Sequence, residues 1–286
     1  RLPAALAGQK RPRRQPDWYF DADSALNLLL QHYQTKTLNG YGIADDDPAI
    51  RPAGCLLQYL YDTHKQTLPP LAPPQRENRD DSLTIDAASR RNHEPELTPR
   101  PYDSARDGLV LGEGGCMMVL EELEHAQARG AHIIAEIVGY GANCDGSHIT
   151  RPEMRTMQRC IELALEDAAL PPSAVGYVSG HGTATEQGDI AETQATAAVF
   201  GYVPISSQKS YLGHTLGACG SLESWFAIEM MRSGWFAPTL NLNDIDPRCG
   251  EADYLTGSGR HIDTEYVMNN NFAFGGVNTS LIFKRW

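Results

Sequence analysis

Residues 175–214 read VGYVSGHGTATEQGDIAETQATAAVFGYVPISSQKSYLGH and hold two short apolar runs with a longer helical stretch between them. The runs at Val175–Val178 and Val203–Ser206 have the length and apolar character of buried strands. Ala191–Phe200 is long enough to form a helix between them. A strand, a helix and a second strand in this order are typical of an α/β architecture.

The same alternation continues on both sides of this stretch. Four more segments have strand character: 116–120, 133–138, 266–270 and 279–283. Two more segments have helical spacing: 154–170, which ends at Pro171-Pro172, and 216–231. We therefore predict an α/β fold with a mostly parallel sheet buried between layers of helices.

Polar, glycine-containing sequence follows three of the predicted strands. The stretches are 179–189, 206–214 and 269–278, and we expect each to be a loop. The second leads into a helix whose start carries small residues, with Glu223 further along it. Because α/β sheets bind ligands at the carboxyl ends of their strands, these loops are the candidate site.

Two histidines in these loops indicate what the site does. His181 and His214 each have a glycine before them, and Lys209 lies five residues before His214. Imidazole and ammonium groups gathered at one place can bind and polarise a carbonyl group. The alternative for His181 is structural, with Gly182 and Thr183 only forming a turn around it.

Composition places the chain among ordinary globular proteins. It has 286 residues, of which 41% are hydrophobic and 21% charged, and a formal net charge of −12. The negative charge argues against binding to nucleic acid. The sequence has no apolar run of eighteen residues and no signal-peptide pattern, so we expect a cytoplasmic protein that does not contact membranes.

Cysteine spacing points to reduced thiols. The six cysteines form no C-x-x-C pair and no spacing typical of a metal site, and we expect neither a disulfide nor a cofactor. They are Cys55, Cys116, Cys144, Cys160, Cys219 and Cys249.

The chain changes character near residue 90. Residues 1–90 hold 11 basic and 11 acidic residues, whereas residues 91–286 carry the whole net charge of −12. The first part also has 9 of the 18 prolines but only 4 of the 26 glycines. In it we predict helices near residues 21–33 and 53–64, a proline-rich connector over 68–74 and a short strand at 82–85.

The first part resembles the bacterial DNA mismatch-repair ATPases of the MutS family. The resemblance lies in RRQPDWYFDADSALNLLLQHYQTKTLNGYG, PAIRPAGCLLQYLYDTHKQTLPPL and RDDSLTIDAASRRN, across residues 14–92. It implies a mostly helical fragment from the end of the connector domain and the start of the core domain. The phosphate-binding motif G-x-x-x-x-G-K-[ST] and the mismatch-reading aromatic motif are absent from the sequence, so neither activity is expected.

The second part, residues 91–286, resembles the C-terminal half of the β-ketoacyl-acyl-carrier-protein synthases, condensing enzymes of the thiolase fold. The motifs are long and occur in order: PYDSARDGLVLGEGG, HGTATEQGD, SSQKSYLGHTLGACGSLES and NNNFAFGGVNTSLIFK. The resemblance implies a thiolase-like half preceded by the mismatch-repair-like fragment, with domains at 1–90 and 91–286. It also implies an acyltransferase of fatty-acid or polyketide biosynthesis whose partner is an acyl carrier protein with a phosphopantetheine-linked acyl or malonyl group.

The resemblance assigns roles to individual residues. His181 and His214 match the histidines that hold the malonyl thioester carbonyl, Lys209 the lysine behind the site and Glu223 the acidic residue that supports it. The remaining assignments are substrate-binding: Thr183, Thr185, Phe272, Phe274 and Asn278. For the two phenylalanines, ordinary core packing is the alternative.

One part of the resembled enzymes has no counterpart. Their nucleophilic cysteine belongs to an A-C-S-S-type turn in the first half of the fold, where this chain has the mismatch-repair-like segment. Cys116 and Cys219 stand where the family usually has another small residue, and no cysteine has an activating setting visible in the sequence. We therefore expect the chain alone to be inactive in condensation.

The sequence ASRRN at 88–92 suits both families, which predicts a fusion joined at this point. Besides the condensing-enzyme interpretation, two alternatives remain: a non-catalytic interaction fragment and a malonyl-thioester decarboxylase. A half-fold would expose apolar surface, so we also expect either misfolding or, if the chain folds, a homodimer.

Overall fold

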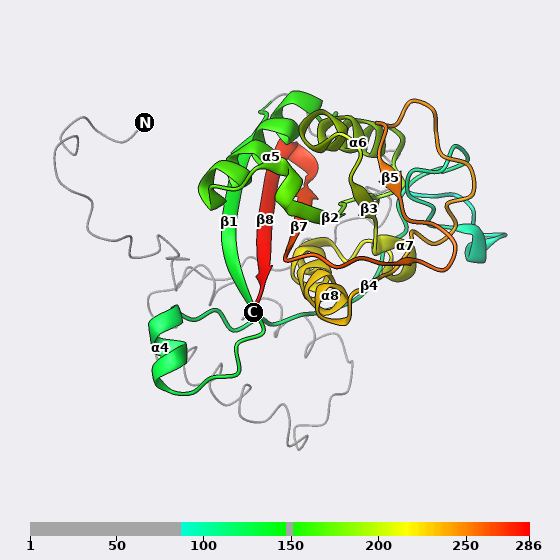
Figure 1. The fold of residues 1–286 in the computed structure, drawn as a ribbon. Coiled ribbons are helices and arrows are strands. Elements are labelled where there is room, and N and C mark those ends of the chain that lie inside the picture. Colours follow the sequence, from blue (N-terminus) through cyan, green and yellow to red (C-terminus); the bar gives the residue numbers. More distant parts are fainter. Residues whose placement is uncertain (1–86, 147–150) are drawn as a thin grey trace, which may run out of the picture. The chain divides into compact units, whose positions relative to one another are not determined.

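The computed structural model describes residues 87–146 and 151–286, which belong to the compact unit Glu77–Trp286 (Figure 1). The helices predicted near 21–33 and 53–64, the connector at 68–74 and the strand at 82–85 lie outside the described residues. Among the described residues, no helix has the length and apolar character needed to cross a membrane.

A six-stranded mixed sheet forms the centre of the fold (Figure 1). Its order is β1 (Ala135–Cys144), β8 (Val277–Arg285), β7 (Tyr266–Phe272), β2 (Val175–Ser179), β3 (Pro204–Ser206) and β5 (Asp253–Tyr254). The α/β class is confirmed. The sheet is less parallel than predicted, because the pairs from β7 to β5 are parallel whereas β8 is antiparallel to both of its neighbours.

Helices cover both faces of this sheet (Figure 1). α5 (Met154–Ala168) and α6 (Glu186–Phe200) pack on one face, and α8 (Cys219–Ser233) packs on the other. The short elements are α4 (Leu123–Ala128), α7 (Lys209–Leu212), the two-stranded sheet of β4 (Trp235–Phe236) and β6 (Arg260–His261), and 3-10 turns at Pro95–Leu97, Pro172–Ala174, Leu216–Ala218 and Phe274–Gly276.

Alternating residues of the central strands supply the two cores. In β2, Tyr177 packs in the core beneath α8, and the next residue, Val178, packs in the core beneath α5 and α6. Val267 and Met268 of β7 divide in the same way. This period of two, with both faces apolar, is why the strands appear in the sequence as continuous apolar runs.

α5 lies unusually close to strand β1. Gly141 makes this approach possible, because a Cβ atom there would lie 2.2 Å from the carbonyl oxygen of Cys160. Gly139 is similarly tight, at 2.4 Å from the carbonyl oxygen of Ala164. The two glycines therefore allow helix backbone to rest directly on strand backbone.

The predicted strand at 116–120 is not formed. Within the described residues this segment pairs with no strand, and Met117 and Val119 are 86% and 84% exposed. An apolar run becomes a strand only where a neighbouring strand accepts its backbone hydrogen bonds, and the described residues place none beside it.

Two other boundaries differ from prediction. Residues 269–278 are predicted to be a loop, but β7 continues through Phe272 and β8 begins at Val277. Each of the two buried asparagines of β7 has a side-chain partner for one of its amide atoms: Asn269 donates to the Ser224 hydroxyl (3.0 Å) and Asn270 accepts from the Ser280 hydroxyl (2.7 Å). Helix α6 begins at Glu186, five residues earlier than predicted.

Candidate functional site

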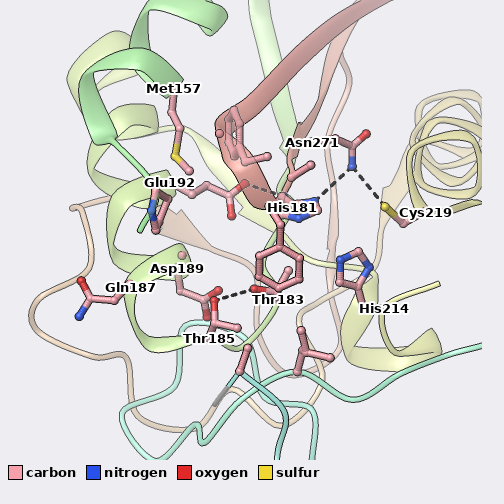
Figure 2. Close-up of a pocket in the computed structure, with 18 of the residues that line it drawn as sticks. Met157, His181, Thr183, Thr185, Gln187, Asp189, Glu192, His214, Cys219 and Asn271 are labelled. Atoms are coloured by element: carbon pink, nitrogen blue, oxygen red, sulfur yellow. Dashed lines mark hydrogen bonds between the residues drawn. The ribbon is translucent and has the colours of Figure 1, made fainter. Parts of the chain in front are cut away.

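The carboxyl ends of three neighbouring strands meet at one pocket (Figure 2). Ser179 at the end of β2 lies opposite Asn269 of β7 on one side and Ser206 of β3 on the other. The polar sequence after each strand therefore reaches the same place, as predicted from parallel strands. The pocket has a volume of about 700 Å³, and His181, His214, Thr183, Thr185 and Phe274 are among the residues that line it.

Glu192 holds the backbone that presents His181. Its carboxyl oxygens accept hydrogen bonds from the backbone N–H groups of His181 (2.5 Å) and Gly182 (2.7 Å). Burial raises the pKa of Glu192 to about 8, although the Gly182 N–H opposes that shift. Glu192 lies on α6, ten residues after Gly182, so its two hydrogen bonds connect this helix to the loop that carries His181.

Two donors face one nitrogen of His181. The Lys209 Nζ atom lies 3.1 Å from His181 Nδ1, and the Asn271 amide nitrogen lies 3.3 Å from the same atom. An ammonium and an amide NH₂ can only donate, so Nδ1 must accept and the proton resides on Nε2. The imidazole is 8% exposed, and its neutral form presents an Nε2–H donor.

His214 also accepts a hydrogen bond at Nδ1. Its Nδ1 accepts a hydrogen bond from the backbone N–H of Leu216 (3.2 Å), which leaves the proton on Nε2. The ring centroids of His181 and His214 are 5.3 Å apart, and the ring planes are nearly perpendicular, at 87°. Burial, followed by the charge of Lys209, lowers the pKa of His214 to about 4, and burial lowers the pKa of His181 well below its ordinary value. Both rings are therefore neutral donors at pH 7.

A buried ion pair stands behind the histidines. Lys209 and Glu223 form it, and each side chain is 2% exposed. The Asn271 amide donates to the other carboxyl oxygen of Glu223 (2.8 Å). Burial raises the pKa of Glu223, and the ammonium of Lys209 opposes the shift. The ion pair and the amide fix the orientation of His181.

Three groups in the site are close enough to hold a cation. The ligand atoms of His181, Cys219 and Glu223 all lie within 4.8 Å of one another. Lys209 is already bonded to two of the three, His181 and Glu223. The ammonium group of Lys209 thus places a positive charge beside two of the three groups that would have to bind the metal ion.

Thr183 and Thr185 lie in a conformationally constrained loop that lines the same pocket as the histidines. The Oγ1 atoms of Thr183 and Thr185 lie 2.8 Å apart and both residues line the pocket. Between them, Ala184 has a φ of +64°, and its N–H donates to Asp189 (3.1 Å). Left-handed backbone at a non-glycine residue is costly, so the contact with Asp189 stabilises this shape.

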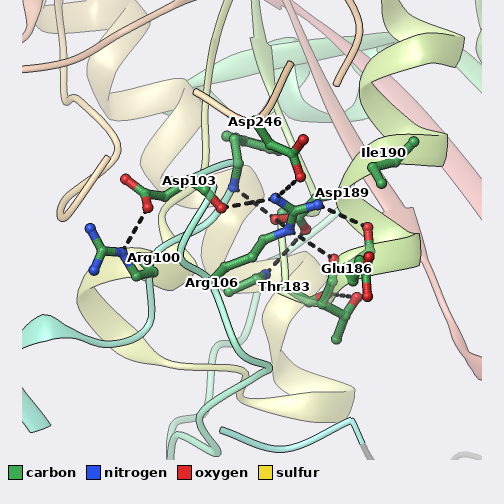
Figure 3. Close-up of polar contacts among 12 residues, drawn as sticks. Arg100, Asp103, Arg106, Thr183, Glu186, Asp189, Ile190 and Asp246 are labelled. Carbon is green, nitrogen blue, oxygen red and sulfur yellow. Dashed lines mark hydrogen bonds and ion pairs between the residues drawn. The ribbon is translucent and has the colours of Figure 1, made fainter. Parts of the chain in front are cut away.

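A buried arginine continues this support (Figure 3). Arg106 lies 3.4 Å from Asp189 and 2.7 Å from Asp246, and its side chain is 2% exposed. Asp189 also accepts from the backbone N–H of Tyr102 (2.8 Å). Burial raises the pKa of Asp189 to about 6, with Arg106 as the main opposing influence. The network ties the threonine loop to the segment around residue 106.

The remaining predicted residues, Phe272, Phe274 and Asn278, differ in their position relative to the pocket. The Phe272 ring lies 6.3 Å from that of His181 and is 7% exposed, whereas Phe274 is 46% exposed at the pocket. Asn278 does not line the pocket: its amide donates to the Asn143 side chain (2.9 Å) across the β1–β8 pair. The other predicted residues gather around the histidines.

Three residues of the site are not evident from the sequence. Glu192 gives no signal, because nothing in a helical stretch shows that a carboxyl group will turn back to a preceding loop. Asn271 lies within the conspicuous stretch NNNF but cannot be told from its neighbours there. Cys219 reads in sequence only as a small residue, yet it lines the pocket.

Comparisons with known proteins agree with the fold. Residues 134–243 match the family model for the C-terminal domain of beta-ketoacyl synthase. The described residues thus have the fold of the C-terminal half of thiolase-fold ketosynthases. Residues 2–72 match a different model, MutS domain II.

Individual relatives give the same result. The chain is 42% identical over 207 residues to a 3-oxoacyl-[acyl-carrier-protein] synthase 2 of Coxiella burnetii, covering 70% of this chain and 50% of the relative. A solved Burkholderia phymatum beta-ketoacyl synthase is 59% identical with a TM-score of 0.72, over 75% of this chain and 53% of that one. Another is a type II polyketide ketosynthase in complex with its acyl-carrier protein, at 33% identity and a TM-score of 0.69, over 75% of this chain and 54% of that one. The chain spans about half the length of the curated relatives it matches.

Proposed function

We propose that this chain binds a malonyl thioester in the 700 Å³ pocket and polarises its thioester carbonyl with His181 and His214. The observation that carries the proposal is the pair of neutral imidazoles, each with Nδ1 accepting a hydrogen bond and Nε2–H left as a donor. Two donors aimed at one oxygen are the arrangement that stabilises a developing enolate.

The chemistry needs no redox partner. The bond between the malonyl carboxylate and the α-carbon breaks, CO₂ leaves, and the electron pair passes to the thioester oxygen as an enolate. The Nε2–H groups of the histidines donate to that oxygen. The enolate then attacks an acyl thioester, as in condensation, or takes a proton from water. The second outcome makes the chain a malonyl-thioester decarboxylase.

The partner we propose is an acyl carrier protein, with Thr183 and Thr185 binding the phosphopantetheine arm. Both threonines line the pocket, and their Oγ1 atoms lie 2.8 Å apart. A relative has been solved in complex with its acyl-carrier protein, which supports this choice of partner. Phe274, half-exposed beside the pocket, is proposed to contact the acyl chain.

For the whole chain we propose a cytoplasmic homodimer with two domains, 1–90 and 91–286. The MutS domain II match over residues 2–72 supports a separate first domain. The backbone of Ala87 and Ser89 is hydrogen-bonded to Leu109, so the last residues before the proposed boundary already contact the second domain. Exposed Met117 and Val119 supply apolar surface that a second copy would cover.

The test is CO₂ release from malonyl-acyl carrier protein. Wild-type chain should release CO₂ well above the rate without protein, and His214→Ala should lower the rate by about 100-fold, the cost of losing one oxyanion donor. His132→Ala, at an exposed histidine outside the pocket, is the matched control and should retain the wild-type rate.

The MutS domain II match favours a second candidate, a non-catalytic interaction fragment. The same experiment decides between them. Equal CO₂ release by the wild-type chain and His214→Ala, or none by either, would exclude decarboxylation and favour the interaction fragment.

A further inference from the structure

Cys219 lies inside the pocket rather than in the packed core around it (Figure 2). It is the first residue of α8 and lines the same cavity as the two histidines. Its sulfur is 3.8 Å from the Asn271 amide nitrogen. The sulfur also lies within 4.8 Å of a ring nitrogen of His181 and a carboxyl oxygen of Glu223.

The surroundings of Cys219 contain the groups that stabilise a thiolate. It stands at the N-terminus of a 15-residue helix, where backbone N–H groups and the helix dipole favour negative charge. Burial raises the pKa of the thiol above its ordinary value, and Lys209 and the Gly220 N–H only partly oppose this shift. The thiol is therefore protonated at rest, with the stabilising groups already in place.

The two histidines supply the rest of an acyl-transfer site. His181 and His214 are both more than nine-tenths buried, and the described residues give neither Nε2 atom a hydrogen-bond partner. All three residues line one cavity, so a thioester bound there would meet two residues that can donate to its oxygen and one whose sulfur can attack its carbon. Donors for the oxygen and a thiol for the carbon are the two parts that acyl transfer needs.

We propose that Cys219 accepts an acyl group from a thioester bound in this pocket. The inference rests on the proposed function, since it requires the pocket to bind thioesters. The Cys219 sulfur forms a bond to the acyl carbon, and the bond from that carbon to the carrier sulfur breaks. The proton of the Cys219 thiol ends on the departing carrier thiol, so one thioester replaces another without an oxidant or reductant.

The other described cysteines lack this setting. Cys160 is fully buried within α5 and bonds to the carbonyl oxygen of Gly141. Cys144 is exposed, and neither it nor Cys116 or Cys249 lines the pocket. All five described cysteines, Cys219 included, are free thiols, so they can be compared in one labelling experiment.

The experiment incubates the full-length chain with the acetyl thioester of N-acetylcysteamine and locates the acetyl group by peptide mass spectrometry. We expect acetylation of Cys219 at a rate at least about tenfold above that of exposed Cys144, because the bound thioester is held beside one thiol. Cys219→Ala should lose the label at this site, Cys144→Ser should keep it, and hydroxylamine should release it.

Acetylation spread over the exposed cysteines, or none at Cys219 in the wild-type chain, would overturn the inference. The wild-type mapping alone decides this, so the result does not depend on how Cys219→Ala folds. CO₂ release is measured on the same preparation. Release of CO₂ without label at Cys219 would refute this inference and leave the proposed function standing, whereas label without CO₂ release would refute decarboxylation.

Discussion

The protonation of His214 determines how the site responds to pH. Its pKa is lowered to about 4 by burial and by Lys209, so the ring stays a neutral Nε2–H donor far below the ordinary titration range of histidine. We expect CO₂ release from malonyl-N-acetylcysteamine to be constant from about pH 8 to about pH 5 and to fall only below that. A pH–rate profile measures this, and an inflection near pH 6.5 would show that a histidine with ordinary titration controls the rate.

Glu192 predicts a pH dependence of stability with a definite sign. Its folded pKa of about 8 lies above the unfolded value of 4.5, so the folded state holds the extra proton between these values. This group therefore stabilises the fold at low pH and loses that contribution as pH rises through 8. The free energy of unfolding should fall by about 1.4 kcal/mol per pH unit from this group within the window.

Comparison with Glu192→Gln isolates that slope. The amide cannot titrate, so the free-energy difference between variant and wild type should move in favour of the variant as pH rises from 5 to 8. Urea unfolding at several pH values provides the measurement. A difference that stays constant with pH would mean that Glu192 does not gain a proton on folding.

At the scale of single residues, sequence patterns reveal the groups in loops and miss those that reach across the fold. His181, Lys209 and His214 follow strands and are predicted to act together, and the structure places them within contact of one another. Asn271 and Glu192 act through distant partners on other elements. Nothing local in the sequence encodes such contacts, because they arise only when the strands are assembled.

The loop between β2 and α6 depends on a buried ion pair. Asp189 fixes the left-handed Ala184 and is itself held by Arg106. Asp189→Asn should destabilise the protein by about 1–3 kcal/mol, because it weakens the acceptor for the buried N–H groups of Tyr102 and Ala184 while Arg106 keeps its ion pair with Asp246. It should also raise the KM for malonyl-acyl carrier protein more than it lowers kcat, because it displaces the threonines rather than the histidines.

Asp253→Asn is the matched control for this prediction. Asp253 also pairs with an arginine, Arg260, but that side chain is 48% exposed. The control should change stability by less than about 1 kcal/mol and leave KM unaltered. Equal effects of the two substitutions on KM would show that the buried pair does not support the threonine loop.

Element types are predictable where the sequence pattern is strong. The strands at 175–178, 203–206, 266–270 and 279–283 are confirmed, as is the helix at 154–170 with a somewhat earlier end. The strand predicted at 116–120 is wrong, because its apolar residues have no pairing strand among the described residues. The continuation of β7 through polar asparagines is not predictable locally, since its hydrogen bonds come from α8 and β8.

The exposed apolar side chains of residues 117–120 predict that the chain associates with a second copy of itself. Met117, Val119 and Leu120 are 86%, 84% and 62% exposed and lie within four consecutive residues. Apolar groups concentrated in this way are usually covered by another surface. Sedimentation of the full chain should show a dimer that weakens on dilution, and Val119→Lys should weaken it by about tenfold or more, since a buried charge is costly.

Tyr202→Lys is the control for association. Tyr202 is 70% exposed but lies two residues past the end of α6, far in sequence from the apolar segment. This substitution should leave the dimer unchanged. A monomer at all concentrations, or equal weakening by both substitutions, would contradict the proposed role of residues 117–120.

The charge of the chain also has meaning at this scale. The net charge of −12 belongs entirely to residues 91–286, and residues 2–72 match a different family model. The change in composition near residue 90 thus falls between the two family matches, at 2–72 and 134–243.

The place of Cys219 could not be predicted from composition, because this residue becomes part of the pocket only through the packing of α8 against β7.

His181 and His214 are proposed to donate hydrogen bonds to one carbonyl oxygen. The most direct measurement is the ¹³C NMR shift of a ketone analogue of acetyl-pantetheine, labelled at the carbonyl and carrying a methylene in place of the thioester sulfur. Bound to the full chain, the carbonyl signal should move downfield, and His181→Ala/His214→Ala should abolish that shift. A bound signal at the same position as the free analogue would show that the two histidines do not donate to the carbonyl oxygen.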